Sequence, residues 1–422
     1  RTGASEGARA VRTSSSSSSS RVIFAMVPAR GPSLDCKRAA LIVCLTAAVV
    51  LGVLYTYTLF EEVQIDDEDA IPGEFAHRSL KSVTVLFRHG ERTPVYDFTN
   101  YPNIYKNDFP EGKGHLTKLG KQHMYHKGKV LRRLYNRFID DVYLEHEILI
   151  KCTIISRTYV SAAMVLAGMY PPKYYQEWSD SETVWQPIPI SNDSPDQTAI
   201  FRTHKCPYTN YFVKKDYDNI ITNKNKKQIE ELLSYLTKKL KKPINVEQIH
   251  IIYDIIASRI SNGFQLPEWI KPKFIKIMKS VSIEHFKRMY GNKKIQKLIS
   301  GPLLKEISLN MQLRSDNSNY KTTKNMYLYA GHDISLGTVL YFLGNRSIIT
   351  PDFGASIHFH LYLDKTVGYI VKVFYYSRWD DDKGEEILIP ACGNPCELEY
   401  FTKRINRHFS TDWEEECKEM EN

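Results

Sequence analysis

The sequence predicts an α/β protein in which a mostly parallel sheet is flanked by helices and covered by an inserted helical cap. Short apolar segments that resemble buried strands alternate with helical segments near both ends of the chain. The middle of the chain is instead rich in Lys and has amphipathic helical periodicity. We therefore expect an α/β domain over residues 81–205 and 312–422, with the cap over residues 206–311.

The N-terminal tail is basic and of low complexity. The chain has 422 residues and a formal net charge of +9, and residues 1–38 hold seven Lys and Arg against two acidic residues, which is +5. The basic balance is therefore interpreted as mostly a property of the tail. The remaining +4 is weak evidence for a polyanion partner, and we expect no nucleic-acid partner. The tail contains the run Ser14–Ser20 and is predicted to be disordered and cytosolic. The true start stays open, with Met26 as an alternative.

An uncharged apolar stretch, residues 39–60, follows the tail. A helix of this length spans roughly 33 Å, enough for the ~30 Å hydrocarbon core of a membrane. Lys37 and Arg38 precede it, so the positive-inside rule places the rest of the chain in the lumen or outside the cell. A retained transmembrane signal anchor is favoured by the length of the stretch. The alternative is a cleaved signal peptide, which would give a secreted or lysosomal protein. The acidic residues 61–80 are predicted to form a stalk.

The α/β part begins with a predicted strand at 83–87 that ends in a polar loop. A helix is expected over about 117–138, then a strand that ends at residue 153 and a helix over 157–169, before two prolines. After the Lys-rich helical segment, three further strands are predicted in NMYLYAGHD, ASIHFHLYLD and VGYIVKVFYYS.

The sharpest chemical signal is the segment RHGERTP at residues 88–94, directly after the first strand. In open α/β folds, ligands bind beyond the carboxyl ends of the strands. Arg88 and Arg92 can bind phosphate oxygens through paired hydrogen bonds and stay charged at any relevant pH. Their charges disfavour protonation of His89, whose lone pair then remains available for attack. Gly90 lets the backbone approach an anion closely.

A second motif, Gly331-His332-Asp333, also follows a predicted strand. A His-Asp pair alone is weak evidence, because such pairs at strand ends are often structural. Together, however, the two loops supply a nucleophile, positive clamps and a titratable acid, which are the needs of phosphoryl transfer. Asp333 is the natural proton donor, and His332 a further phosphate contact. Arg157 begins a predicted helix, but its spacing alone favours a solvated surface arginine.

These motifs resemble those of the histidine acid phosphatases, the two-domain branch of the histidine phosphatase superfamily. The resemblance covers residues 81–417 and includes RHGERTP, GHLTKLGKQH, RTYVSAAMVLAGMYPP, NGFQLPEW, GPLLKEI, GHD and CGNPC. It implies that His89 forms a phosphohistidine, and that Asp333 protonates the leaving oxygen and then helps to activate water. It further implies that four residues bind the phosphate: Arg88, Arg92, Arg157 and His332.

The resemblance also implies that neither a metal nor an organic cofactor is used, and no His or Cys spacing in the sequence suggests a metal site. Small phosphomonoesters are the expected substrates. The sequence does not determine the oligomeric state, and a homodimer is one of the assemblies that it allows. One departure stands out, because Lys151-Cys152-Thr153-Ile154 replaces the family's Arg-Ser-Thr-Asp. We expect this tetrad to support Arg157, so the change affects rate and preference more than chemistry.

The cysteines agree with export. In an oxidising compartment, Cys392 and Cys396 suit a short-range disulfide, and Cys206 with Cys417 could close a long loop. Cys152 is left over and is expected to be a buried free thiol. The sequons at Asn345 and Asn192 are glycosylation candidates.

Two classes of function remain. The first is an acid phosphatase that hydrolyses phosphomonoesters. The alternative is a catalytically weak or inactive secreted or surface family member that acts as a binding protein. A phosphatase specific for a phospholipid or an inositol phosphate would differ in the cap rather than in the core. The Lys clusters at 214–227 and 238–242 are interpreted as solvated helix faces.

Overall fold

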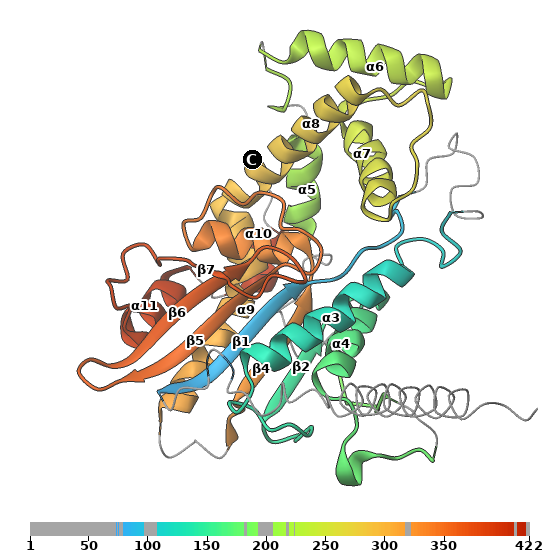
Figure 1. Ribbon diagram of the computed structural model, residues 1–422. Helices are drawn as coiled ribbons and strands as arrows, with labels where there is room; N and C mark the ends of the chain where they lie inside the picture. The colour runs from blue at the N-terminus through green and yellow to red at the C-terminus, as the bar shows by residue number, and fades with distance from the viewer. Residues whose placement is uncertain are drawn as a thin grey trace, which may run out of the picture. The chain divides into compact units, whose positions relative to one another are not determined.

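In the computed structural model, the strands of the described residues form one seven-stranded sheet in the order β3-β2-β4-β1-β5-β6-β7 (Figure 1). The structure describes residues 73, 75, 79–96, 108–180, 184–192, 206–216, 219–222, 224–316, 322–408 and 412–418. The predicted tail, the membrane segment 39–60 and all of the stalk except residues 73, 75, 79 and 80 lie outside these ranges. No helix within them is long and apolar enough to cross a membrane.

The sheet confirms the predicted α/β class and is mixed. β1, β2, β3 and β4 pair in parallel, while β5, β6 and β7 join through antiparallel pairs. For β5 and β6 the antiparallel pairing has a simple cause, because only three residues separate the two strands, and so short a connection allows only a hairpin. The strands are β1 Leu80–Arg88, β2 Ile148–Cys152, β3 Ser191–Asn192, β4 Met326–Gly331, β5 Ser356–Asp364, β6 Gly368–Tyr376 and β7 Glu385–Glu386.

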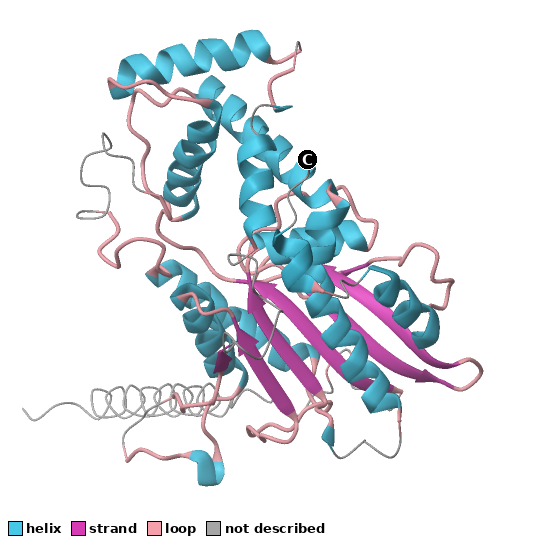
Figure 2. Cartoon of the chain, turned by 180° about the vertical axis from the view of Figure 1, so that it is seen from behind, coloured by secondary structure: helices cyan, strands magenta, loops and turns pink. Residues whose placement is uncertain are grey.

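Helices cover both faces of the sheet, as Figures 1 and 2 show. Along β1, Val85 and Phe87 point into the core shared with α3 and α4, whereas Leu86 points into the opposite core. The second core is closed by α9, α10 and α11. Burial on both faces explains why β1 is an almost continuous apolar run. The helices are α3 Lys118–Leu134, α4 Ser156–Met169, α9 Lys293–Ser315, α10 Asp333–Phe342 and α11 Leu398–His408.

The Lys-rich middle of the chain is helical, as its periodicity predicts. Its helices are α5 Pro207–Asp216, α6 Lys226–Leu240, α7 Val246–Ser261 and α8 Pro272–Gly291. Residues of α6, α7 and α8 form a separate hydrophobic cluster. α9 continues from this helical segment into the sheet core, where Leu304 and Ile307 are buried. A disulfide between Cys206 and Cys417 joins the start of the segment to the short helix α12, Trp413–Lys418.

A buried lysine interrupts the apolar face of α3. Lys127 is 0% exposed, and its ammonium group has no hydrogen-bond partner among the described residues. The ammonium nitrogen lies 5.2 Å from the centroid of the Tyr376 ring. Burial lowers the pKa of Lys127 to about 7, so the folded state resists the charged form.

Lys127→Met is expected to raise the free energy of unfolding by roughly 1–3 kcal/mol, because it removes a buried polar group without a partner. The pKa of this lysine falls from 10.5 to about 7 on folding, so its destabilising effect grows as the pH falls from 10.5 to 7 and is constant below. Denaturant unfolding between pH 6 and 9 measures the gain, with the exposed Lys129→Met as control. A variant less stable than the wild type at every pH would contradict this account.

Candidate active site

The two predicted motif loops leave neighbouring strands at the same level of the sheet. β1 and β4 are parallel, and Arg88 lies directly opposite Gly331. The amide N–H of His89 donates to the carbonyl oxygen of Gly331 at 3.1 Å. Because both strands end here, the loops that begin with His89 and His332 open at the same edge, and the two imidazole centroids lie 5.4 Å apart. The convergence expected from the sequence is therefore present.

The hydrogen bonds of His89 determine which ring nitrogen carries the proton. Its Nδ1 lies 2.8 Å from the carbonyl oxygen of Gly90, which can only accept. Its Nε2 accepts a hydrogen bond from Nε of Arg157 at 3.0 Å. Nδ1 is thus protonated, and Nε2 presents its lone pair. Burial, followed by the charges of Arg157 and Arg88, holds the pKa of His89 well below its usual value, so the imidazole is neutral.

Three groups contact the guanidinium group of Arg88. Its Nη1 donates to the carbonyl oxygen of Pro351 at 2.7 Å, and its Nη2 forms an ion pair with Asp333 at 2.9 Å. The guanidinium carbon also lies 4.0 Å from the centroid of the Phe353 ring. Burial alone raises the pKa of Asp333, but Arg88, Arg92 and His332 outweigh it and lower the pKa to about 2. Asp333 is therefore ionised in the free site.

Arg157 lies in the site rather than on the open surface that its spacing favours. It follows Ser156, the first residue of α4, and besides His89 it contacts Nδ1 of His332 through Nη2 at 3.4 Å. The other nitrogen of His332, Nε2, lies 3.2 Å from the hydroxyl of Thr153. Burial and Arg157 lower the pKa of His332 to about 3. Both ring nitrogens of His332 are thus occupied in the free site.

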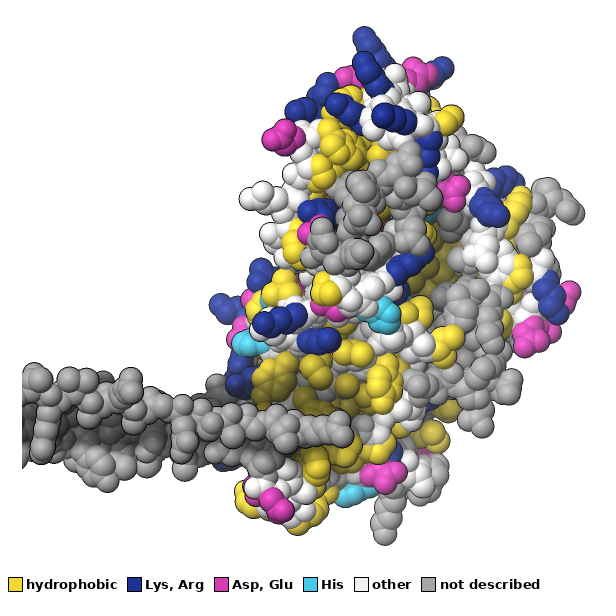
Figure 3. Space-filling model, turned by 90° about the vertical axis from the view of Figure 1, so that its right-hand side faces the viewer, with side chains coloured by type: hydrophobic (Ala, Val, Ile, Leu, Met, Phe, Trp, Pro, Cys, Tyr) yellow, Lys and Arg dark blue, Asp and Glu magenta, His cyan; other side chains and the backbone are white. Residues whose placement is uncertain are grey.

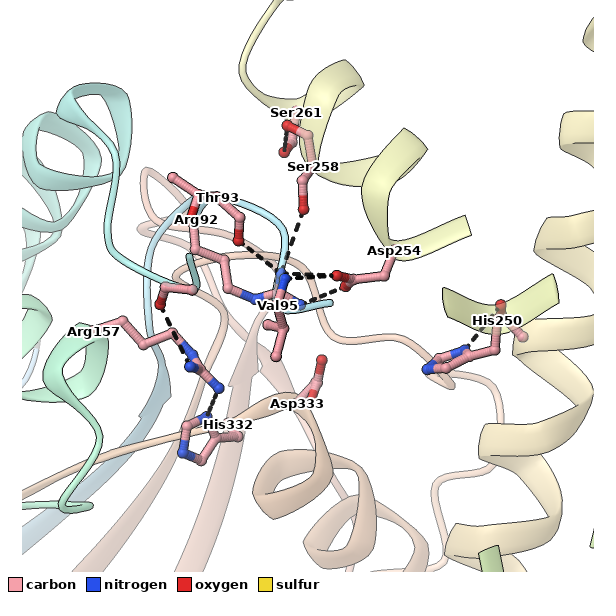
Figure 4. A network of polar contacts seen from close by, with 12 residues as sticks. Arg92, Thr93, Val95, Arg157, His250, Asp254, Ser258, Ser261, His332 and Asp333 are labelled. Atoms are coloured by element: carbon pink, nitrogen blue, oxygen red, sulfur yellow. Dashed lines mark hydrogen bonds and ion pairs between the residues drawn. The ribbon is translucent and has the colours of Figure 1, made fainter. Parts of the chain in front are cut away.

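Arg92 is held by a helix of the Lys-rich segment, as Figure 4 shows. Its Nη2 and Nη1 donate to the two carboxylate oxygens of Asp254 on α7 at 2.6 and 3.3 Å. Nη1 also approaches the hydroxyl of Ser258 at 3.4 Å. The sequence interpretation missed both α7 residues. The available signal was their spacing, because His250, Asp254 and Ser258 recur every four residues and so share one face of this Ile-rich helix.

Two arginine donors in the site are unsatisfied. The Nε–H groups of Arg88 and Arg92 are buried and have no hydrogen-bond partner among the described residues. Buried N–H groups are almost always paired, and unpaired ones are costly. An oxyanion would bring further acceptors to this group of arginines, so the arrangement suits a phosphate group.

Close backbone packing fixes the loop that carries His89. The amide N–H of Gly90 donates to the hydroxyl of Ser161 on α4 at 3.2 Å. At the start of α3, the amide N–H of Thr117 donates to the carbonyl oxygen of Glu91 at 3.0 Å. A Cβ atom on Gly120 would lie 2.1 Å from that oxygen, so only glycine allows α3 to approach the loop this closely.

The departure at Lys151–Ile154 touches the site through one residue. Lys151 forms an ion pair with Glu306 of α9 at 2.8 Å, away from the site. Cys152 is buried and belongs to neither disulfide, as expected, and Ile154 is exposed. Only Thr153 joins the network, through His332 and the hydroxyl of Thr158 at 2.7 Å. The expected support of Arg157 by the whole tetrad is thus reduced to an indirect contact through Thr153 and His332.

The structure contains both expected disulfides, Cys206–Cys417 and Cys392–Cys396. Asn345 lies in a turn after α10, where its Oδ1 accepts from the amide N–H of Ser347 at 3.1 Å. Asn192 ends β3, and its side chain lies outside the described part. Glycosylation of either residue stays a prediction.

The positive charge of the chain is not mainly a property of the tail, contrary to the sequence interpretation. Residues 206–311 hold 20 Lys and Arg against nine Asp and Glu, a net charge of +11. The rest of the chain after residue 38 is therefore at −7. Figure 3 shows Lys and Arg side chains gathered at the end of the molecule where α6 lies. This segment also provides the wall that contacts Arg92, so anions approach a positive surface there.

No cluster of three or more His, Cys, Asp or Glu side chains in the described part of the chain could hold a metal ion. The polar groups of the site are instead arginines and histidines that contact one another and two carboxylates. Such a set binds anions rather than cations.

Comparisons with known proteins agree with this geometry. The family model "Histidine phosphatase superfamily (branch 2)" matches residues 79–376. Prostatic acid phosphatase of Mus musculus is 28% identical over 382 residues, covering 88% of this chain and 95% of that protein. Lysosomal acid phosphatase of Xenopus laevis is 27% identical over 356 residues, covering 81% of this chain and 79% of that protein. The Citrobacter braakii phytase structure shares the fold, with a TM-score of 0.58, 15% identity and coverage of 80% and 99%.

Inorganic phosphate is expected to bind the site and stabilise the fold, because guanidinium groups form charge-assisted hydrogen bonds with phosphate oxygens. At about 100 times its dissociation constant, phosphate should raise the free energy of unfolding by about 2.7 kcal/mol. Arg157→Leu should weaken phosphate binding at least about tenfold without leaving a buried carboxylate unpaired. Thermal unfolding against phosphate concentration measures this, with the exposed Arg346→Leu as control. Equal phosphate stabilisation of Arg157→Leu and the wild type would rule out Arg157 as a ligand.

Proposed function

The chain belongs to branch 2 of the histidine phosphatase superfamily and is a phosphatase, and we propose that it hydrolyses phosphomonoesters through a phosphohistidine on His89. The observation that carries the proposal is the orientation of His89. Its proton is on Nδ1, bonded to Gly90, and its Nε2 lone pair faces Arg157. A neutral imidazole with a directed lone pair is a competent nucleophile.

In the proposed reaction, Nε2 of His89 attacks phosphorus while the bond between phosphorus and the ester oxygen breaks. Arg88, Arg92 and Arg157 stabilise the negative charge on the other phosphate oxygens. In the free site, Nη2 of Arg157 contacts Nδ1 of His332. When the phosphate binds, Arg157 would therefore have to turn towards it. His332 would then be released to donate a hydrogen bond to the phosphate as well. Water then attacks the phosphohistidine, which releases inorganic phosphate and restores the lone pair.

Asp333 is the proposed general acid, and its charge explains why acidic conditions would favour activity. In the free site its pKa is about 2 because Arg88 and its neighbours stabilise the carboxylate. A bound phosphate competes for Arg88 and places negative charge nearby, and both effects raise the pKa of Asp333. The protonated form donates to the leaving alkoxide and then, as a carboxylate, takes a proton from the attacking water.

We also propose that the catalytic unit lies outside the cytosol. Two disulfides support an oxidising compartment. Relatives named prostatic and lysosomal acid phosphatase fit the secreted or lysosomal alternative. The other proposal is that residues 39–60 anchor the chain in a membrane. Carbonate extraction of membranes from expressing cells would distinguish this anchor from release of a shortened soluble form.

His89→Ala is expected to lower kcat/KM for an aryl phosphate by roughly 10⁴-fold or more, the scale seen when a covalent nucleophile is removed. Steady-state hydrolysis of 4-nitrophenyl phosphate measures the loss, and the exposed His146→Ala serves as control. Melting temperatures should show that both variants are folded. If a folded His89→Ala keeps more than about a tenth of wild-type kcat/KM, His89 is not the nucleophile.

Asp333→Asn is expected to slow alkyl phosphates by about 10²- to 10⁴-fold and aryl phosphates far less, because good leaving groups need little protonation. In the wild type, the alkyl-to-aryl ratio of kcat/KM should fall as the pH rises, since the protonated fraction of Asp333 falls. In the variant this ratio should be independent of pH. The exposed Asp352→Asn is the matched control. Equal losses for the two ester classes would exclude the acid role.

A further inference from the structure

Helix α7 presents a polar stripe to the site. His250, Asp254 and Ser258 follow one another at intervals of four residues and therefore share one face of the helix. The neighbouring apolar residues are buried in the cluster of the Lys-rich segment: Ile249, Ile252, Ile255 and Ile256. Asp254 and Ser258 both contact Arg92. The stripe therefore continues the phosphate site onto α7, and His250 lies one turn further along.

The imidazole of His250 is held in one orientation by α8. Its Nδ1 shares a hydrogen bond of 3.2 Å with the hydroxyl of Ser282. The centroids of the His285 and Phe286 rings each lie 5.5 Å from the centroid of the His250 ring. Among the described residues, Nε2 of His250 has no hydrogen-bond partner. Figure 4 shows the ring pointing from α7 towards the side of the site where Asp333 lies, and the charges of Asp254, Asp333 and Arg92 all act on this imidazole.

We infer that His250 is a specificity-determining residue that binds a hydroxyl group on the alcohol side of the substrate. This inference rests on the proposed function, in which the leaving oxygen takes its proton from Asp333. The alcohol of the ester then lies on the side of the phosphorus opposite His89, next to Asp333. His250 faces Asp333 and so lines the space that this alcohol occupies.

The chemistry of the free Nε2 atom of His250 suits a hydroxyl group. Whichever nitrogen carries the proton, Nε2 can make one hydrogen bond, as donor or as acceptor, and a hydroxyl accepts either arrangement. Burial and His285 lower the pKa of His250 to about 4, which keeps the ring neutral above that pH. Phosphate esters of polyhydroxy alcohols are therefore the preferred class.

A matched pair of substrates tests the inference. Glycerol 2-phosphate and isopropyl phosphate share a carbon skeleton, and only the first carries free hydroxyls. The wild type should favour glycerol 2-phosphate by about tenfold in kcat/KM, the value of one good hydrogen bond. His250→Phe should abolish this preference, change isopropyl phosphate less than about twofold and leave inhibition by inorganic phosphate unchanged. His250→Gln, which keeps a hydrogen-bonding group, should retain part of the preference.

Each alternative result has a defined meaning. Hydrolysis of neither ester by the wild type would reject the proposed function, and this inference with it. If the wild type cleaves both esters without preference, or if His250→Phe keeps the preference, only the inference fails. An equal loss for both esters in His250→Phe and His250→Gln would assign His250 a structural role and would also overturn the inference.

Discussion

The burial of a neutral imidazole among arginines is the constraint on which the rest of the site depends. Nε of Arg157 donates to Nε2 of His89 while the carbonyl oxygen of Gly90 accepts from Nδ1. Burial and the surrounding cations make a second proton on this ring costly, so the lone pair is preserved. In the proposed function, the same cations bind the phosphate group of the substrate. In the proposed function, one arrangement thus keeps the nucleophile unprotonated and attracts the substrate.

The site depends on contacts between the α/β core and the Lys-rich helices. The core contributes Arg88, His89 and Asp333 at the edge where β1 and β4 end. α7 contributes Asp254, whose carboxylate holds Arg92 through two hydrogen bonds. Removal of one partner from so buried a pair leaves an uncompensated charge. The helical segment therefore fixes the position of Arg92, one of the predicted phosphate ligands.

Much of this arrangement could be predicted from the sequence because it depends on short-range patterns. The strands before RHGERTP and GHD are apolar runs that end in polar loops, and parallel pairing brings their ends together. The antiparallel β5–β6 hairpin follows from its three-residue connection. By contrast, the contact between Arg92 and Asp254 joins residues 162 positions apart, and no local sequence pattern indicates it. The placement of Arg157 likewise depends on how α4 packs, so only the family resemblance indicated it. The positive charge of residues 206–311 could be counted from the sequence. It was missed because these residues were summed together with the acidic rest of the chain after residue 38.

The most direct test of this account is to trap and locate the covalent intermediate. The wild-type protein would be mixed with 4-nitrophenyl phosphate, quenched within milliseconds at alkaline pH, where phosphohistidine survives, and digested for mass spectrometry. The account predicts a phosphoryl group on the peptide that contains His89, attached to Nε2 and lost on mild acid treatment. A phosphoryl group on another residue, or turnover with no phosphorylated peptide at any quench time, would contradict it.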